Sequence, residues 1–162
     1  MPRAAINDFE IIETTVSDKV AELFPLLQSH RDELATAKHL MEVAPNVEAY
    51  RALEQCGALL ALVAYLGAAD AGEPAIAGYS INFIGPHLHY SGLRYAHNDA
   101  LFVAPEHRGG RLGHTLMRET ERRAKEKGAA MMMWHAKPHT ALEVMLPRMG
   151  YAVQDVIFSK EI

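Results

Sequence analysis

The chain has 162 residues, a formal net charge of −4, and apolar side chains at 49% of its positions. A chain of this length most simply forms one domain spanning residues 1–162. Mild acidity argues against a nucleic-acid partner, whose binding surfaces are normally basic. No apolar run approaches the roughly 20 residues of a membrane span, so no membrane partner is expected. The single cysteine, Cys56, allows no internal disulfide, and the absence of a secretory signal favours a cytoplasmic protein.

The first third of the chain predicts one strand followed by three helices. The strand covers residues 9–15, and Ser17 is expected to cap the first helix. A second helical stretch is predicted over residues 31–41. The third begins after Asn46, reaches Gln55 and ends at Gly57.

The remainder of the chain predicts strands first and then an alternation of strands and helices. In chain order these are strands over 58–66, 75–84 and 95–103, a helix from near 112 to 128, a strand over 130–136, a helix over 140–149 and a closing strand over 151–158. The first two strands form a hairpin with a turn at 70–74. The later alternation is typical of an α/β core with βαβ connections.

The most informative stretch is residues 103–113, Val-Ala-Pro-Glu-His-Arg-Gly-Gly-Arg-Leu-Gly, between a strand and a helix. Backbone N–H groups at the start of a helix have no intrahelical partner and can hold a phosphate. The stretch is not a Walker A loop, because no Gly-Lys-Ser/Thr follows. It is not a dinucleotide fingerprint either, because Gly-x-Gly-x-x-Gly is absent.

This stretch resembles the pyrophosphate loop of the GNAT N-acetyltransferases, Arg/Gln-x-x-Gly-x-Gly/Ala. Arg108 and Gly113 agree with that pattern, but Arg111 stands where the first glycine is usual. Arg111 should therefore avoid the left-handed backbone region, or Gly110 must adopt it instead. Within the family the chain looks most like a phage and prophage subgroup. The motifs that carry this likeness are Gly78-Tyr79, residues 86–90, the stretch from Asn98 to Pro105, Trp134-His135-x-Lys137-Pro138 and Gly150-Tyr151.

The resemblance implies a single α/β (α+β) domain with helices on both faces of a mixed central sheet. Its fourth and fifth strands would splay around acetyl-CoA, the cosubstrate. Residues expected to contact acetyl-CoA are Leu101, Phe102 and Val103 along the pantetheine, Arg108, Gly109, Gly110, Arg111, Leu112 and Gly113 around the pyrophosphate, and His139 near the thiolate. An N–H near Val103 would stabilise the oxyanion. Leu146 stands where relatives carry the Tyr that protonates the departing thiolate, so that role has no evident residue.

Attack on a thioester needs a neutral amine, whereas an alkylamine of pKa about 10.4 is protonated at neutral pH. A base on the fourth strand is therefore expected, and His97 and Asp99 are the candidates. Strand alternation places both on one face with Leu101 and Val103, unless a bulge shifts the register. No metal site is expected, because no third ligand accompanies His87 and His89.

The first hypothesis is thus direct acetyl transfer to a primary amine in a ternary complex. Candidate acceptor-binding residues are His30, Glu33, His89 and Tyr90. A protein N-terminus, a lysine, a polyamine, an antibiotic and a modified nucleobase all stay open as acceptors, as does a homodimer. Two alternatives are a non-catalytic acyl-CoA-binding module acting on a partner, which Arg111 and Leu146 favour, and a phosphate-binding module for another nucleotide.

Overall fold

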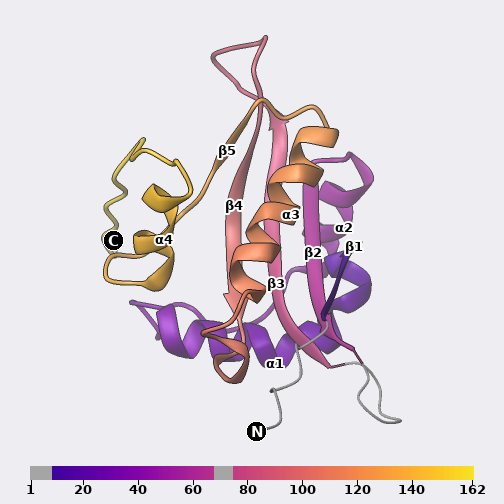
Figure 1. Cartoon of the computed structure of the whole chain (residues 1–162), viewed down its shortest axis with the longest axis vertical. Helices are drawn as coiled ribbons and strands as arrows, with labels where there is room; N and C mark the ends of the chain where they lie inside the picture. Colours follow the sequence, from indigo (N-terminus) through magenta and orange to yellow (C-terminus); the bar gives the residue numbers. More distant parts are fainter. Residues whose placement is uncertain (1–8, 68–74) are drawn as a thin grey trace, which may run out of the picture.

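The computed structural model describes residues 9–67 and 75–162, so the predicted turn at 70–74 lies outside the described residues. The described strands form one mixed sheet in the order β1-β2-β3-β4-β5, in which β4 and β5 are parallel and the other neighbours antiparallel. The strands are β1 (Phe9–Thr14), β2 (Leu59–Leu66), β3 (Ile76–Pro86), β4 (Arg94–Val103) and β5 (Met131–Met133). The helices are α1 (Val16–Leu34), α2 (Val47–Gln55), α3 (Leu112–Glu126) and α4 (Ala141–Arg148), with a short 3-10 helix, η1 (Pro105–His107). This arrangement confirms the predicted α/β class (Figure 1).

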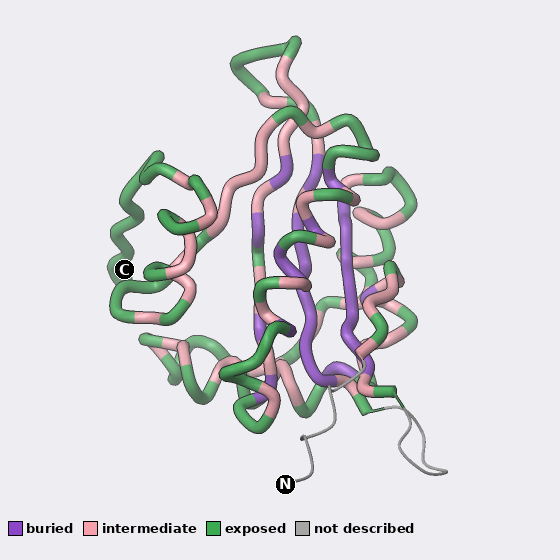
Figure 2. The backbone as a smooth tube through the Cα atoms, in the orientation of Figure 1, coloured by how far each residue is buried: buried purple, intermediate pink, exposed green. Residues whose placement is uncertain are grey.

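The sheet is covered by helices on both faces, as predicted. Leu23 of α1 and Leu53 of α2 pack against Val63 on one face. Leu116 of α3 packs against Leu62 on the other face. The nearly continuous apolar sequence of β2 is explained by its burial on both sides (Figure 2).

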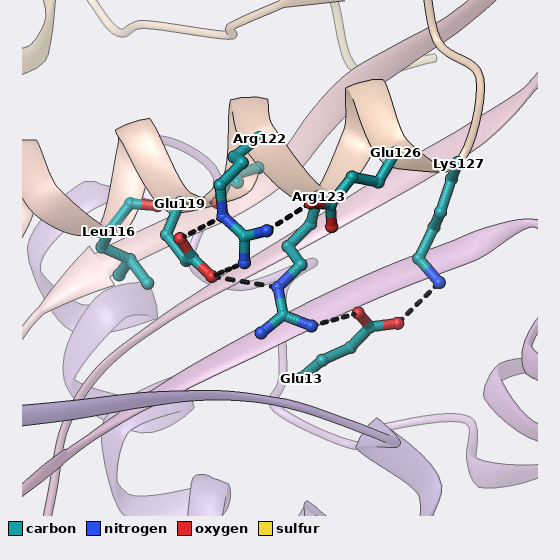
Figure 3. Close-up of polar contacts among 8 residues, drawn as sticks. Glu13, Leu116, Glu119, Arg122, Arg123, Glu126 and Lys127 are labelled. Atoms are coloured by element: carbon teal, nitrogen blue, oxygen red, sulfur yellow. Dashed lines mark hydrogen bonds and ion pairs between the residues drawn. The ribbon is translucent and has the colours of Figure 1, made fainter.

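Helix α3 is the element that the sequence predicts best. The residues on its buried face are Leu112, Leu116, Met117, Thr120 and Ala124. Its outer face carries a network of ion pairs that reaches β1 (Figure 3). In this network Arg123 bonds Glu119 at 2.9 Å, and Glu13 accepts from Lys127 at 2.6 Å. Each of these partly exposed ion pairs adds little stability. Together they connect α3 to β1, an edge strand of the sheet.

The N-terminus of α1 differs from the sequence prediction. The helix begins at Val16, so Ser17 lies in its first turn and is not the cap. The backbone N–H groups of Val16 and Ser17 donate to the Glu54 carboxylate at 2.5 and 3.2 Å. The Glu54 carboxylate of α2 therefore caps the N-terminus of α1 in place of a local side chain. Its negative charge also interacts favourably with the positive end of the helix dipole.

The predicted helix over residues 31–41 is wrong. Helix α1 continues through its internal Pro25 to Leu34, and residues 35–46 form no helix. The Arg31 guanidinium holds this irregular segment against α1, because it donates to the carbonyls of Lys38 and Met41 at 2.6 and 2.9 Å. Helix α2 follows as predicted, capped by the Asn46 side chain, which accepts from the Ala49 N–H.

The predicted closing strand over residues 151–158 is also wrong, and β5 is shorter than predicted. Residues 151–162 form neither helix nor strand. Val153, Val156 and Phe158 are exposed, although they follow an apolar pattern typical of a strand. An apolar pattern becomes a strand only where a neighbouring edge supplies hydrogen bonds, and no described strand pairs with this segment. Within the described ranges, no helix is both long and apolar enough to cross a membrane.

Candidate functional site

The site begins where β4 and β5 separate. The two strands pair only at Tyr95–Met131, Ala96–Met132 and His97–Met133, and β4 then continues alone on that side to Val103. In Figure 1, β5 runs away from β4 towards α4. Past His97, the β5-facing edge of β4 therefore has no strand partner in the part of the chain that the structure describes.

The backbone of β4 directs hydrogen-bonding groups into this gap. Ala104 N–H donates to the Ala77 carbonyl at 2.9 Å, which makes these two residues a hydrogen-bonded antiparallel pair. Because such pairs alternate with non-hydrogen-bonded ones, the N–H and C=O groups of Leu101 and Val103 face away from β3. An extended ligand could pair with them as another strand would.

A β-bulge changes the predicted face of the candidate bases. The β3–β4 register passes from Ile81–Ala100 to Asn82–Asn98, which leaves Asp99 as the extra residue. His97 stacks on Phe83 beneath α1 and α2, whereas Leu101 packs with the cluster beneath α3. The prediction that His97 shares a face with Leu101 is therefore wrong, because a bulge shifts the register of β4 between them.

Buried amides hold this bulge in place. The Asn98 Nδ2 group donates to the Ile81 carbonyl at 3.2 Å and to Asn82 Oδ1 at 3.0 Å. Asn82 in turn donates to the Leu60 carbonyl at 3.1 Å. Sequence reasoning missed this network. The detectable signal was a pair of asparagines inside two otherwise apolar strands, since buried polar side chains need partners.

The N-terminus of α3 differs from the other helix starts. Carboxylate, amide or hydroxyl oxygens accept N–H groups at the starts of α1, α2 and α4, whereas α3 has neither a side-chain cap nor an acidic residue in its first turn. Gly109 adopts the left-handed conformation, with φ of +79°, and Arg111 is right-handed, with φ of −88°. Arg111 therefore avoids the left-handed region, as the first of the two predicted alternatives required, and the left-handed glycine of the loop is Gly109 and not Gly110. Among the described residues, a Cβ at Gly109 or Gly110 would meet no atom within 4 Å, so the start of α3, which has no side-chain cap, adjoins open space.

The gap and the loop share a cavity of about 890 Å³. Its walls include many of the predicted site residues, namely His30, Glu33, Asp99, Leu101, Phe102, Val103, Arg108, Gly109, Gly110, Gly113 and His139. They also include His135 and Lys137, which sequence reasoning did not single out as site residues. The structure thus brings together residues from α1, β4, the glycine loop and the segment before α4.

Other predicted site residues lie outside the wall of this cavity. His89 and Tyr90 are exposed in the connection between β3 and β4. Arg111 is the residue before α3 and Leu112 is its first residue, and both lie beside the lining glycines. His97 lies behind the wall, with its ring centroid 5.6 Å from that of His135. Burial, assisted by His135, lowers the pKa of His97 and so favours its neutral form.

Arg108 and Glu33 are bound to each other. The two terminal guanidinium nitrogens of Arg108 donate to the two Glu33 oxygens at 2.9 and 2.8 Å. Arg108 Nε also donates to the Val103 carbonyl at 2.8 Å. The hydrogen bond from Arg108 lowers the pKa of Glu33. This pair therefore joins the end of α1 to the glycine loop. Arg108, which is predicted to bind the pyrophosphate, is bound to Glu33, which is predicted to bind the acceptor.

His139 has an unusual backbone. Its φ is +65°, the only positive value among the described non-glycine residues. Its N–H donates to Glu143 at 2.6 Å, which holds this conformation at the start of α4. A left-handed non-glycine residue costs about 1 kcal/mol or more, and such residues cluster at functional sites. Helix α4 contains no tyrosine, and Leu146 does not line the cavity.

A smaller cavity of about 440 Å³ adjoins the first. The two share His30, Leu34 and Lys137 as lining residues. The remaining wall is mostly apolar, with Glu42 as its one carboxylate among the described residues. The site therefore has two compartments that meet at His30.

Comparison with known proteins agrees with this geometry. Residues 27–151 match the acetyltransferase (GNAT) family. No curated protein sequence matches the chain. A ribosomal-protein-alanine N-acetyltransferase from Brucella melitensis biovar Abortus 2308 is 19% identical, with a TM-score of 0.70 over 96% of this chain and 100% of its own.

Two further solved structures share the fold. An aminoglycoside acetyltransferase from an uncultured soil metagenomic sample, in complex with sisomicin, is 17% identical, with a TM-score of 0.71 over 95% of this chain and 96% of its own. A Trypanosoma brucei acetyltransferase is 17% identical, with a TM-score of 0.67 over 96% and 100% of the two chains. The chain belongs to the acetyltransferase (GNAT) family and is an acetyltransferase that uses acetyl-CoA as its cosubstrate.

Proposed function

We propose that the protein transfers the acetyl group directly to a primary amine in a ternary complex. The observation that carries this proposal is the shared cavity, in which β4 backbone groups that have no strand partner among the described residues lie next to an uncapped helix start. Those two features suit the two ends of one ligand, an extended amide-bearing arm and a pyrophosphate. The expected contacts with Phe102, Arg111 and Leu112 form part of this proposal.

Acetyl-CoA supplies an acyl thioester, and the residues around it must hold it and manage protons. We assign the arm to the outward-facing groups of Leu101 and to the N–H of Val103, whose carbonyl accepts from Arg108 Nε, and the pyrophosphate to the N–H groups from Gly109 to Gly113. A β4 N–H near Val103 is the proposed donor that stabilises negative charge on the reacting oxygen.

Proton removal from the amine is assigned to His97 and Asp99. Burial keeps His97 neutral near pH 7, so it is able to accept a proton. Asp99 lines the cavity and lies two residues further along the bulged strand. We propose that Asp99 passes the proton through water to His97. His139 is the proposed donor to the departing thiolate, since Leu146 has no proton to give.

The acceptor is proposed to occupy the smaller cavity, with its amino group near His30. Glu33 lines the larger cavity, where Arg108 neutralises its charge. His89 and Tyr90 would contact only the outer part of a large acceptor, because they line neither cavity. A single cytoplasmic domain, the phage-type subgroup and the absence of a nucleic-acid partner remain predictions.

The alternative is a non-catalytic acyl-CoA-binding module, and the lack of a phenol on α4 favours it. Thiol release from acetyl-CoA, measured with a panel of primary amines, separates the two functions. Calorimetry with CoA is the binding control. We expect release that depends on an amine and that falls at least about tenfold in both His97→Gln and Asp99→Asn. CoA binding without release for any amine would favour the binding module, and binding of ATP but not CoA would contradict both.

A further inference from the structure

His30, near the C-terminal end of α1, lies at the junction of the two cavities and lines both of them. Its ring stacks on Phe102 of β4, with centroids 4.8 Å apart. Its Nδ1 atom lies 2.6 Å from the hydroxyl oxygen of Tyr79, which is completely buried. Tyr79 also lines the smaller cavity, so Nδ1 is occupied by a residue of the cavity wall, and Nε2 is the ring nitrogen left for a ligand. Nε2 has no hydrogen-bond partner within residues 9–67 and 75–162.

The buried hydroxyl decides which nitrogen of His30 carries the proton. Within the described residues, Nδ1 of His30 is the one acceptor that the Tyr79 O–H can reach. A buried hydroxyl group donates its proton where an acceptor is present. Burial also raises the pKa of Tyr79, so this proton is retained. Nδ1 therefore accepts, and a neutral His30 ring carries its own proton on Nε2.

The surroundings keep His30 uncharged near pH 7. Burial is the largest cause that lowers its pKa, and it outweighs the opposing attraction of Glu33 on the same helix. Lys137, from the segment after β5, and Arg108, from the glycine loop, lower the pKa further. The cavity junction therefore presents a neutral N–H donor and not a cation.

We propose that Tyr79 is a positioning residue, and that through it His30 offers a single neutral N–H donor that selects amines bearing a hydrogen-bond-accepting oxygen beside the amino group. If the His30 N–H donated to the attacking nitrogen of the amine, it would occupy the lone pair that the reaction needs. The His30 N–H must therefore donate to an atom beside that nitrogen. A carbonyl beside a peptide α-amine and a hydroxyl in an amino sugar both supply that atom. This inference rests on the proposed amine acetylation.

The first test needs no substrate. Nitrogen NMR of ¹⁵N-histidine-labelled protein at pH 7 reports the tautomer of each ring, and His30→Gln assigns the signal. We expect His30 to carry its proton on Nε2 in the wild type and a mixture of tautomers in Tyr79→Phe. Tyr65→Phe is the matched control, because Tyr65 belongs to the same core cluster as Tyr79. Its hydroxyl donates to Glu22 at 3.3 Å and not to His30. A wild-type ring that is charged or carries its proton on Nδ1 would overturn the proposal.

The second test measures selectivity as a ratio of kcat/KM values, which cancels general losses of activity. Alaninamide is compared with isopropylamine for the carbonyl, and ethanolamine with propylamine for the hydroxyl. Tyr79→Phe should lower one or both ratios about twofold, because in a mixture of tautomers about half of the His30 rings carry no proton on Nε2. Tyr65→Phe should not change them, and His30→Gln, which keeps an N–H donor, should retain them.

Equal ratios in the wild type and Tyr79→Phe would contradict the selective role. If no amine is acetylated although CoA binds, the proposed function fails. The NMR result then decides the assignment of Tyr79 alone.

Discussion

At the scale of single residues, Arg108 has two competing partners. Its guanidinium is held by Glu33 through two charge-assisted hydrogen bonds, and it lies 5.0 Å from the Phe102 ring centroid. The proposed pyrophosphate would draw on the same positive charge. Because both side chains are about 39% exposed, the ion pair itself adds little stability. Its effect is expected in ligand affinity.

Glu33→Gln should tighten CoA binding about threefold, because the Arg108 charge is no longer neutralised. Arg108→Ala should weaken binding about tenfold. Calorimetry at two salt concentrations checks both, since screening should shrink the differences. Glu42→Gln removes a nearby carboxylate that makes no ion pair in the described structure, and it serves as the control. Weaker CoA binding by Glu33→Gln would mean that Glu33 positions Arg108 and does not compete for it.

At the scale of elements, the bulge in β4 decides where Asp99 lies. Asn98 is buried and supplies donors that the interrupted ladder would otherwise lack. Without the bulge, Asp99 would pair with a residue of β3 in the β3–β4 ladder. A shift of one residue in this register would move side chains to the opposite face of the sheet. The amide network therefore links the packing beneath α3 to the position of a candidate catalytic carboxylate.

Asn98→Ala should lower the free energy of unfolding by about 1–3 kcal/mol, because it leaves buried acceptors unpaired. Urea unfolding followed by circular dichroism measures this change. Asp99→Ala, at the exposed neighbouring position, should stay within about 0.5 kcal/mol of the wild type. Similar stabilities for the two variants would show that the network does not hold the bulge.

The start of α1 allows a second test at this scale. Glu54→Ala should cost about 1 kcal/mol, because the first N–H groups of α1 lose their acceptor. The adjacent and exposed Gln55→Ala is the matched control, and chemical denaturation compares the two. An equal, small loss in both variants would contradict the capping role of Glu54.

At the scale of the whole molecule, two partly buried histidines, His30 and His97, connect stability to pH. Burial is the main cause that lowers both pKa values below the ordinary value of about 6.5. Between the lowered and the ordinary pKa, the unfolded chain binds more protons than the folded one. Stability contributed by these groups is therefore complete above about pH 6.5 and is lost as the pH falls below it.

Urea midpoints measured from pH 7.5 to 5.5 should fall below about pH 6.5 in the wild type and fall less in His97→Gln. His89→Gln, in the exposed connection between β3 and β4, should follow the wild type. The carboxylates with lowered pKa values, such as Glu119 at about 2, lose their contribution only at lower pH. A midpoint in His97→Gln that falls as steeply as in the wild type would remove His97 from this explanation.

The sequence by itself determined those features that depend on neighbouring residues. The period of α3 defined its buried face, Gly128 ended it, and the glycines before it marked an uncapped helix start. Asn46 and Gly57 likewise bounded α2, because capping and left-handed turns act over a few residues. The splay of β4 and β5 and the cosubstrate were expected only through the family resemblance.

The tertiary structure decided whatever depends on distant partners. Glu54 replaces the cap expected of Ser17, and Arg108 is paired with Glu33, 75 positions earlier in the chain. Residues 151–158 have a strand pattern but no strand partner. The bulge at Asp99 and the proposed tautomer of His30 each depend on a side chain from β3. Sequence periodicity cannot report such contacts, because they depend on which buried donors and acceptors meet when the chain folds.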